Sequence, residues 1–152
     1  TTLHTNDASG AIPRFIDLGV RPISLAPALR MVIAQRLVRK VCKHCAQKKK
    51  LSKEEVVLFK KELSDLKIKI PKISSKTQIL KSKGCPECNF TGYRRRIGIF
   101  EALLVDDDIE SLILKNSSSL EIKKTAIKKG MVTLYQDGLL KVLSQITTLE
   151  EV

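Results

Sequence analysis

Four cysteines are the residues of this sequence with the clearest chemistry. They form two Cys-x-x-Cys pairs, Cys42 with Cys45 and Cys85 with Cys88, and no other cysteine occurs in the 152 residues. Two residues between ligands let a turning backbone direct both sulfurs at one point, and two such turns supply four thiolates to one tetrahedral ion. The spacing therefore predicts a structural zinc site. Because four thiolates leave no open position for water, we do not expect catalysis at this ion.

Two other interpretations of these residues remain open. The interval of 39 residues between Cys45 and Cys85 is about twice that of common zinc ribbons, which indicates an insertion between the pairs. Two disulfides would also use four cysteines, but no secretory signal is visible, so we expect a reducing compartment and favour zinc. His44 lies inside the first pair and could replace a cysteine as ligand, although we rank it below all four sulfurs.

The charge of the chain is concentrated around the cysteines. The net charge is +12, and residues 42–96 hold 16 Lys and Arg against 5 Asp and Glu. Such a segment can attract nucleic acid or anionic lipid by releasing counterions. It has few aromatic residues that could stack on bases, so we interpret it as a solvated surface and do not expect nucleic acid as a partner. A stand-alone basic zinc-ribbon module that binds nucleic acid is the alternative function.

Composition bounds the remaining possibilities. A chain with 43% hydrophobic and 4% aromatic residues can enclose one moderate aliphatic core or two small ones. No apolar run approaches the roughly 20 residues of a membrane span. The sequence begins at Thr1 without an initiator methionine, so we expect further sequence upstream.

Apolar spacing predicts the elements before the first cysteine pair. A short β-compatible stretch around Leu3 precedes a helix that Asp7 or Ser9 caps and Gly19 ends. A second, longer helix capped by Ser24 is predicted to lead into Cys42. Its apolar residues recur at helical spacing: Leu25, Leu29, Val32, Ile33, Leu37 and Val41.

Capping patterns predict most of the later elements. Ser52 and Glu55 form a capping box before an apolar stripe of Val56, Phe59, Leu63 and Leu66. Residues 67–83 read as extended, with no role beyond spacing, and residues 97–104 as a strand. Three helices follow that begin after Asp106, Ser118 and Thr133, and another begins at Thr147.

Several motifs, taken together, carry a family resemblance. In order, they are Leu3-His4-Thr5-Asn6-Asp7-Ala8, Ala34-Gln35-Arg36-Leu37-Val38-Arg39, the two cysteine pairs, Thr91-Gly92-Tyr93 and Asp137-Gly138-Leu139. With them the chain resembles the C-terminal part of the type II secretion and type IV pilus assembly ATPases, in their zinc-binding tetracysteine subtype. The likeness runs from residue 1 to residue 152 and breaks mainly across the insertion, residues 46–84.

The resemblance implies an α/β fold in three consecutive segments. Residues 1–41 would be the distal portion of a RecA-like P-loop ATPase core, residues 42–96 a tetracysteine zinc-binding subdomain with a Lys-rich insertion, and residues 97–152 a strand followed by a small helical subdomain. The complete protein would be a homohexameric motor that couples ATP hydrolysis to pilus assembly or type II secretion, with the zinc subdomain transmitting motion. Its expected cofactors are Zn²⁺, ATP and Mg²⁺.

The resemblance also implies a place and a partner in the cell. It places the protein in the cytoplasm, peripheral to the bacterial inner membrane, where an inner-membrane platform protein would be its partner. The choice among pilus assembly, secretion and DNA uptake stays open.

Two residues match nucleotide-site positions of the family. His4 matches the family's histidine box, which implies a sensor or coupling group near the terminal phosphate, and Arg96 matches an arginine of the pattern T-G-Y-x-G-R-x-G-I near the nucleotide. Arg95 and Gln145 stand where the family carries glycine. The motif G-x-x-x-x-G-K-[ST] is absent here, so we expect it upstream and expect these residues alone to be inactive as an ATPase.

Overall fold

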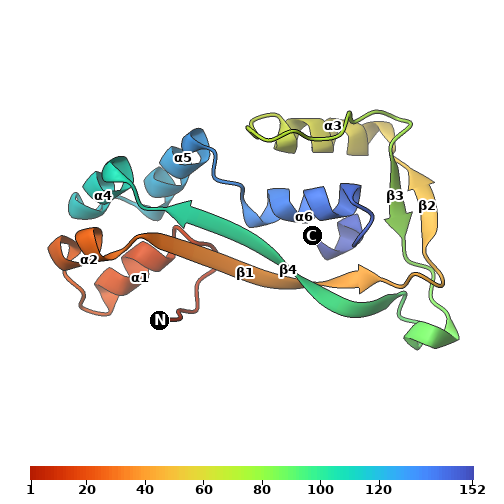
Figure 1. Ribbon diagram of the computed structural model, residues 1–152, viewed down its shortest axis with the longest axis horizontal. Helices are drawn as coiled ribbons and strands as arrows, with labels where there is room; N and C mark the ends of the chain where they lie inside the picture. The colour runs from red at the N-terminus through yellow and green to blue at the C-terminus, as the bar shows by residue number, and fades with distance from the viewer. The chain divides into compact units, whose positions relative to one another are not determined.

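The computed structural model describes residues 1–152 and has a mixed α/β fold (Figure 1). The helices are α1 (Ala11–Asp17), α2 (Pro22–Ala28), α3 (Lys53–Leu63), α4 (Asp107–Leu114), α5 (Ser119–Lys129) and α6 (Leu134–Leu143), with short 3₁₀ helices η1 (Pro86–Cys88) and η2 (Leu149–Glu151). The strands are β1 (Met31–Val41), β2 (Gln47–Lys50), β3 (Gln78–Lys81) and β4 (Tyr93–Leu104). No helix has the length and apolar character needed to cross a bilayer.

The chain divides into two compact units, each assembled from two separate stretches. The first unit comprises residues 1–35 and 100–134, and the second comprises residues 36–99 and 135–152. The paired strands β1 and β4 contribute residues to both units. The three consecutive segments implied by the resemblance stay a prediction about domains.

The first unit has an aliphatic core between its helices and the strand pair. Ten buried residues form it: Ala8, Ile12, Leu25, Ala26, Leu103, Ile109, Ile113, Ile122, Ala126 and Met131. Helix α4 packs against α2 and α5. The expected caps are present, since Asp106 accepts the Ile109 N–H at 3.2 Å and Ser118 accepts the Glu121 N–H at 3.3 Å. Gly130 ends α5 in the left-handed conformation.

The long helix predicted over residues 25–41 is wrong. Helix α2 ends at Ala28, and residues 31–41 form strand β1. A helix would place Val32, Ile33 and Leu37 on one stripe, but in the structure Val32 is half-buried against the core while Ile33 and Leu37 are exposed. The β-branched residues of this stretch suit an extended chain, and its pairing with β4, distant in sequence, decides the outcome.

The N-terminal stretch also departs from expectation in part. Residues 1–5 form no strand. Helix α1 forms where predicted, but its N-cap is Gly10, which makes no side-chain capping bond. Asp7 instead accepts the Gly10 N–H at 2.9 Å and the Ser9 hydroxyl at 3.1 Å.

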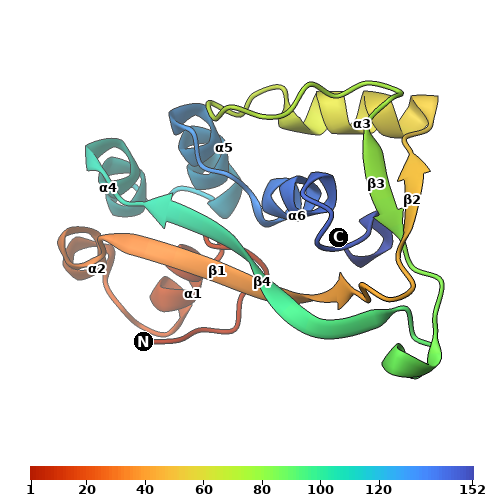
Figure 2. The ribbon, with the colours of Figure 1, turned by 45° about the vertical axis from the view of Figure 1, so that its right-hand side comes forward.

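The second unit has a separate core, to which the insertion contributes buried residues. Helices α3 and α6 lie side by side in both ribbon views (Figures 1 and 2). Buried residues of α3, of the rest of the insertion and of α6 form one cluster: Leu51, Phe59, Leu63, Ile73, Ile79, Leu139 and Val142. The predicted capping box of α3 is confirmed, with Ser52 and Glu55 bonding to each other's backbone N–H.

The insertion does more than provide spacing. Residues 78–81 form β3, which pairs antiparallel with β2 from Gln47↔Lys81 to Lys50↔Gln78. Ile73 and Ile79 are buried in the core of the second unit, so the segment predicted to have no role beyond spacing contributes packing. The helix predicted from Thr147 is only the short 3₁₀ helix η2.

Candidate metal centre

The first cysteine pair forms a tight turn directly after β1. Cys42 donates its backbone N–H to the Gly92 carbonyl at 2.9 Å, which continues the pairing of β1 with β4. The backbone then reverses, because the N–H groups of Cys45 and Ala46 both donate to the Cys42 carbonyl, at 3.3 and 2.9 Å. This turn is the local structure that a two-residue spacing between ligands requires.

The second pair lies in and beside η1. The N–H groups of Cys88 and Phe90 both donate to the Cys85 carbonyl, at 3.1 and 2.9 Å. Asn89 and Phe90 have φ values of 50° and 59°, which lets the chain reverse within a few residues. Gly92 then takes a φ of 79°, where an added Cβ would lie 2.6 Å from Ser82 Cβ, so a larger residue would not fit this close approach.

Two strand pairs bring the distant cysteine turns together. The β2–β3 ladder begins two residues after Cys45 and ends four residues before Cys85, which closes the long interval between the pairs. The β1–β4 pairing joins Cys42 to Gly92 from the other side. The 39-residue interval is therefore no obstacle to a single four-cysteine cluster.

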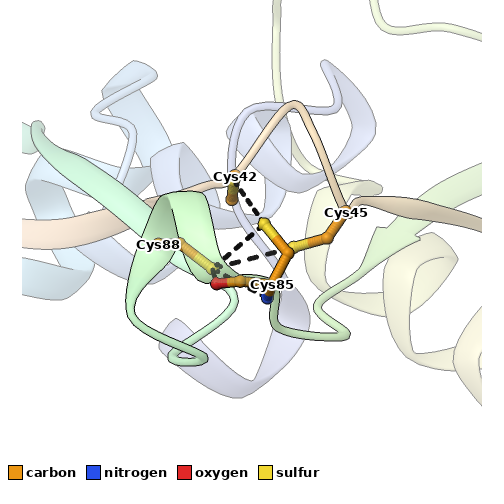
Figure 3. A group of neighbouring side chains, drawn as sticks. All are labelled: Cys42, Cys45, Cys85 and Cys88. Atoms are coloured by element: carbon orange, nitrogen blue, oxygen red, sulfur yellow. Dashed lines mark hydrogen bonds between the residues drawn. The ribbon is translucent and has the colours of Figure 1, made fainter.

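The four sulfurs have the spacing of a tetrahedral ligand set (Figure 3). All lie within 4.8 Å of one another. The separations are 3.9 Å for Cys42 to Cys85, 3.9 Å for Cys45 to Cys88 and 3.7 Å for Cys85 to Cys88. A tetrahedron with Zn–S bonds of about 2.3 Å has S···S edges of about 3.8 Å, whereas a disulfide is about 2.05 Å long. None of the four is in a disulfide, so the geometry fits a metal.

Backbone N–H groups support a thiolate at Cys88. Its sulfur accepts the N–H of Cys85 at 3.2 Å and that of Gly92 at 3.3 Å. Burial acts to raise the pKa of Cys88, but these donors and the neighbouring thiols outweigh it and lower the pKa to about 6. Burial and the neighbouring thiols raise the pKa of Cys85 to about 12. A metal ligand must be deprotonated, so the two N–H donors favour the form in which Cys88 would bind a cation.

The other predicted site residues lie outside this cluster. His44 is exposed and is not a member of the group that could hold a metal. His4 is exposed in the first unit, and Arg96 is exposed in the second. Arg96 lines a hollow of about 200 Å³ together with Arg39, Thr91, Tyr93, Arg94 and Arg95.

Arg95 has an unusual backbone conformation for a residue of β4. The Val105 N–H donates to the Arg30 carbonyl and the Cys42 N–H to the Gly92 carbonyl, so thirteen steps along β4 match twelve along β1. One extra residue therefore lies on β4 between these two contacts, and Arg95, within that stretch, has a φ of 68°. Glycine suits this conformation, and the family resemblance implies glycine at this position. Arg95 directly precedes Arg96.

A contact between β1 and the C-terminal segment was not predicted from the sequence. Arg39 bonds Glu151 at 2.6 Å, and its guanidinium lies 4.3 Å from the centre of the Tyr93 ring. The Tyr93 hydroxyl is 2.9 Å from the Thr148 hydroxyl, and Thr147 donates to the Arg39 carbonyl at 2.7 Å. Thr147 and Thr148 are both buried, although nothing in their sequence neighbourhood indicates this contact.

Comparison with known proteins places the chain in a family. Residues 1–152 match the family described as Type II/IV secretion system protein. The chain belongs to this family. It is 45% identical over 151 residues to the type IV pilus assembly ATPase PilB of Thermus thermophilus, and 41% identical over 152 residues to the type II secretion system ATPase E of Vibrio cholerae. It is 39% identical to the type II secretion system protein E of Pectobacterium carotovorum.

These relatives are much longer than the chain. The matches cover 99 to 100% of the chain, but only 16% of the Thermus protein and 28% of the other two. Membership of the secretion system family agrees with the resemblance carried by the sequence motifs. It does not favour the alternative of a stand-alone module that binds nucleic acid.

Proposed function

We propose that this chain is the C-terminal part of a hexameric motor ATPase that drives type IV pilus assembly or type II secretion. The match of all 152 residues to ATPases of these machines carries the proposal. Residues 1–41 would be part of a RecA-like core. The phosphate-binding loop of that core would bind ATP with Mg²⁺. The partners would be other copies of the chain and an inner-membrane platform protein, met from the cytoplasmic side.

The four cysteines would hold one structural Zn²⁺ in this motor. The sulfur separations and the N–H donors to Cys88 support this assignment. Four thiolates fill a tetrahedral shell, so the ion would supply rigidity and no catalysis. The core of the second unit is small, and a metal cross-link there would let the subdomain transmit motion without unfolding.

His4 and Arg96 would serve the nucleotide in the complete protein. An imidazole at the histidine loop, residues 4–7, can hydrogen-bond a terminal phosphate or an attacking water, and so report whether that phosphate is present. The planar guanidinium of Arg96 suits a phosphate or ribose contact. Both side chains are exposed and can reach a ligand.

The zinc assignment is tested by elemental analysis of the complete protein. We expect about one zinc ion per chain and essentially none in the Cys42→Ala and Cys85→Ala variants, because three thiolates bind far more weakly than four. Nucleotide affinity should stay within about threefold of the parent, since the cysteines lie outside the nucleotide residues. His44→Ala is the matched control and should keep its zinc. Unchanged zinc content in Cys85→Ala would refute the site.

The motor assignment is tested by ATP turnover of the same protein. We expect hydrolysis by the complete protein and none by residues 1–152 alone, which lack the phosphate-binding loop motif. A duplex-binding assay over a salt series checks the alternative. A steep loss of affinity with rising salt, together with absent turnover, would favour a nucleic-acid-binding module instead.

A further inference from the structure

Glu101 is a buried acidic residue that the proposed function does not use. It lies in β4, and only 1% of its surface is exposed. One carboxylate oxygen accepts the Ala8 N–H at 2.9 Å, and the other accepts the Leu134 N–H at 3.2 Å. A carboxylate has two acceptor oxygens and no donor, so it matches a pair of buried N–H groups. One side chain thus satisfies two segments that are 126 residues apart in sequence.

Both segments lie beside parts of the chain whose movement could affect function: the histidine loop and the start of α6. Ala8 directly follows the histidine loop, residues 4–7. Leu134 is the first residue of α6 and the last residue of the first unit, so the chain passes from it into the second unit. A shift of the Leu134 N–H would therefore break its bond to Glu101 or move the carboxylate that fixes Ala8.

A second contact holds the same loop from α5. Lys123 bonds the Asp7 carboxylate at 2.7 Å, and the other oxygen of that carboxylate accepts the Gly10 N–H at 2.9 Å. His4 itself is exposed. The histidine loop is thus held by the ion pair of Asp7 with Lys123, and Ala8, the residue after the loop, is held by Glu101.

We propose that Glu101 is a positioning residue that couples the histidine loop to the start of α6. The functional side of this inference rests on the proposed role of His4 at the nucleotide. A buried N–H that loses its acceptor costs free energy, so the two hydrogen bonds of Glu101 favour one joint arrangement of loop and helix. Movement at Leu134 would then be felt at His4, and a change at the loop would be felt at Leu134.

The test compares Glu101→Gln with the parent in the complete protein. Glutamine keeps the shape and one acceptor oxygen but presents an NH₂ group to one of the two N–H donors, so one bond is lost. We expect about a tenfold fall in kcat for ATP with KM changed less than about twofold. Hydrogen–deuterium exchange should rise at residues 4–10 and around residue 134. Glu55→Gln is the matched control and should change neither, because glutamine also serves in a capping box.

A reciprocal variant keeps the inference testable if Glu101→Gln does not fold. Leu134→Pro removes the N–H donor at a position where proline fits the first turn of a helix. We expect faster exchange at residues 4–10, although the substitution is more than 120 positions away. Unchanged exchange there in a folded variant would overturn the coupling.

Three further results would overturn the proposal or the role on which it rests. Exchange that rises uniformly over the first unit, with kcat and KM changed in parallel, would show a general structural role and overturn the proposal. Local exchange changes with an unchanged kcat would overturn the link to turnover. If the parent protein hydrolyses no ATP, the motor assignment fails, and the exchange data alone decide whether loop and helix are coupled.

Discussion

Gln145 has a backbone conformation that suits glycine better than glutamine. Its φ is 58°, it is exposed, and the family resemblance implies glycine at this position. A residue with a Cβ costs roughly 1–2 kcal/mol in the left-handed region, part of which the freedom of glycine in the unfolded chain offsets. We expect Gln145→Gly to raise the free energy of unfolding by about 0.5–1 kcal/mol, measured by urea denaturation, even though the bond from Gln145 to the Gln78 carbonyl is lost.

The adjacent residue provides the control for this prediction. Ser144 is also exposed, but it is not among the residues with positive φ. Ser144→Gly should therefore lower the free energy of unfolding by roughly 0.5–1 kcal/mol. Equal losses in both variants would mean that the backbone conformation at Gln145 is not strained.

Asp7 should make the first unit sensitive to acid. Burial acts to raise its pKa, but the hydrogen bonds from Lys123 and the Gly10 N–H outweigh burial and lower it. A group whose pKa is lowered on folding stabilises the protein above its unfolded pKa, and this contribution is lost as the pH falls through the folded pKa. We expect Asp7→Asn to destabilise by roughly 1 kcal/mol at pH 7 and by progressively less toward pH 3.

Denaturant unfolding at a series of pH values measures this difference. Asp17→Asn is the matched control, because Asp17 is an exposed carboxylate of α1. Its effect should be small and nearly constant with pH. A penalty for Asp7→Asn that does not shrink as the pH falls would contradict the proposed stabilisation by Lys123.

At the scale of elements, the sequence predicted the caps and turns that depend on residues close together in the chain. The capping box of α3, the caps of α4 and α5 and the two cysteine turns depend on residues a few positions apart, and all five form. Strand β1 was predicted as a helix because its apolar residues happen to fall at helical spacing. Its true partner, β4, begins 52 residues after β1 ends, and no local pattern reports that pairing.

Helix α6 depends on a close approach that only glycine permits. A Cβ on Gly138 would overlap Val152 Cγ1 and lie 3.0 Å from Val152 Cγ2. Alanine stabilises a helix by about 1 kcal/mol relative to glycine, but an extra methyl group in a closely packed contact costs about 1–3 kcal/mol. We expect Gly138→Ala to destabilise by about 1 kcal/mol, and Val152→Ala to restore much of that loss in the double variant. Thermal unfolding of the four proteins of this cycle measures the coupling, and simple additivity would argue against the contact.

At the scale of the whole molecule, the sequence predicted the four ligands of the site but not the contacts that surround them. The two Cys-x-x-Cys pairs predicted four sulfurs around one point, and the structure brings them within 4.8 Å. The contacts that surround the site were not predictable, because Arg39 with Glu151 and Tyr93 with Thr148 join residues 112 and 55 positions apart. The division into two units, each from two stretches, follows from such pairings.

The two units should respond differently to removal of the proposed zinc ion. All four cysteines lie in the second unit, and each unit has its own buried core. Because metal binding contributes folding free energy, a chelator at pH 7 should raise amide exchange by about 100-fold or more around residues 42–46 and 84–92. The rise should extend through the second unit, while residues 1–35 and 100–134 stay protected. Exchange measured before chelation, after it and after zinc is added back checks this prediction, which equal loss of protection in both units would contradict.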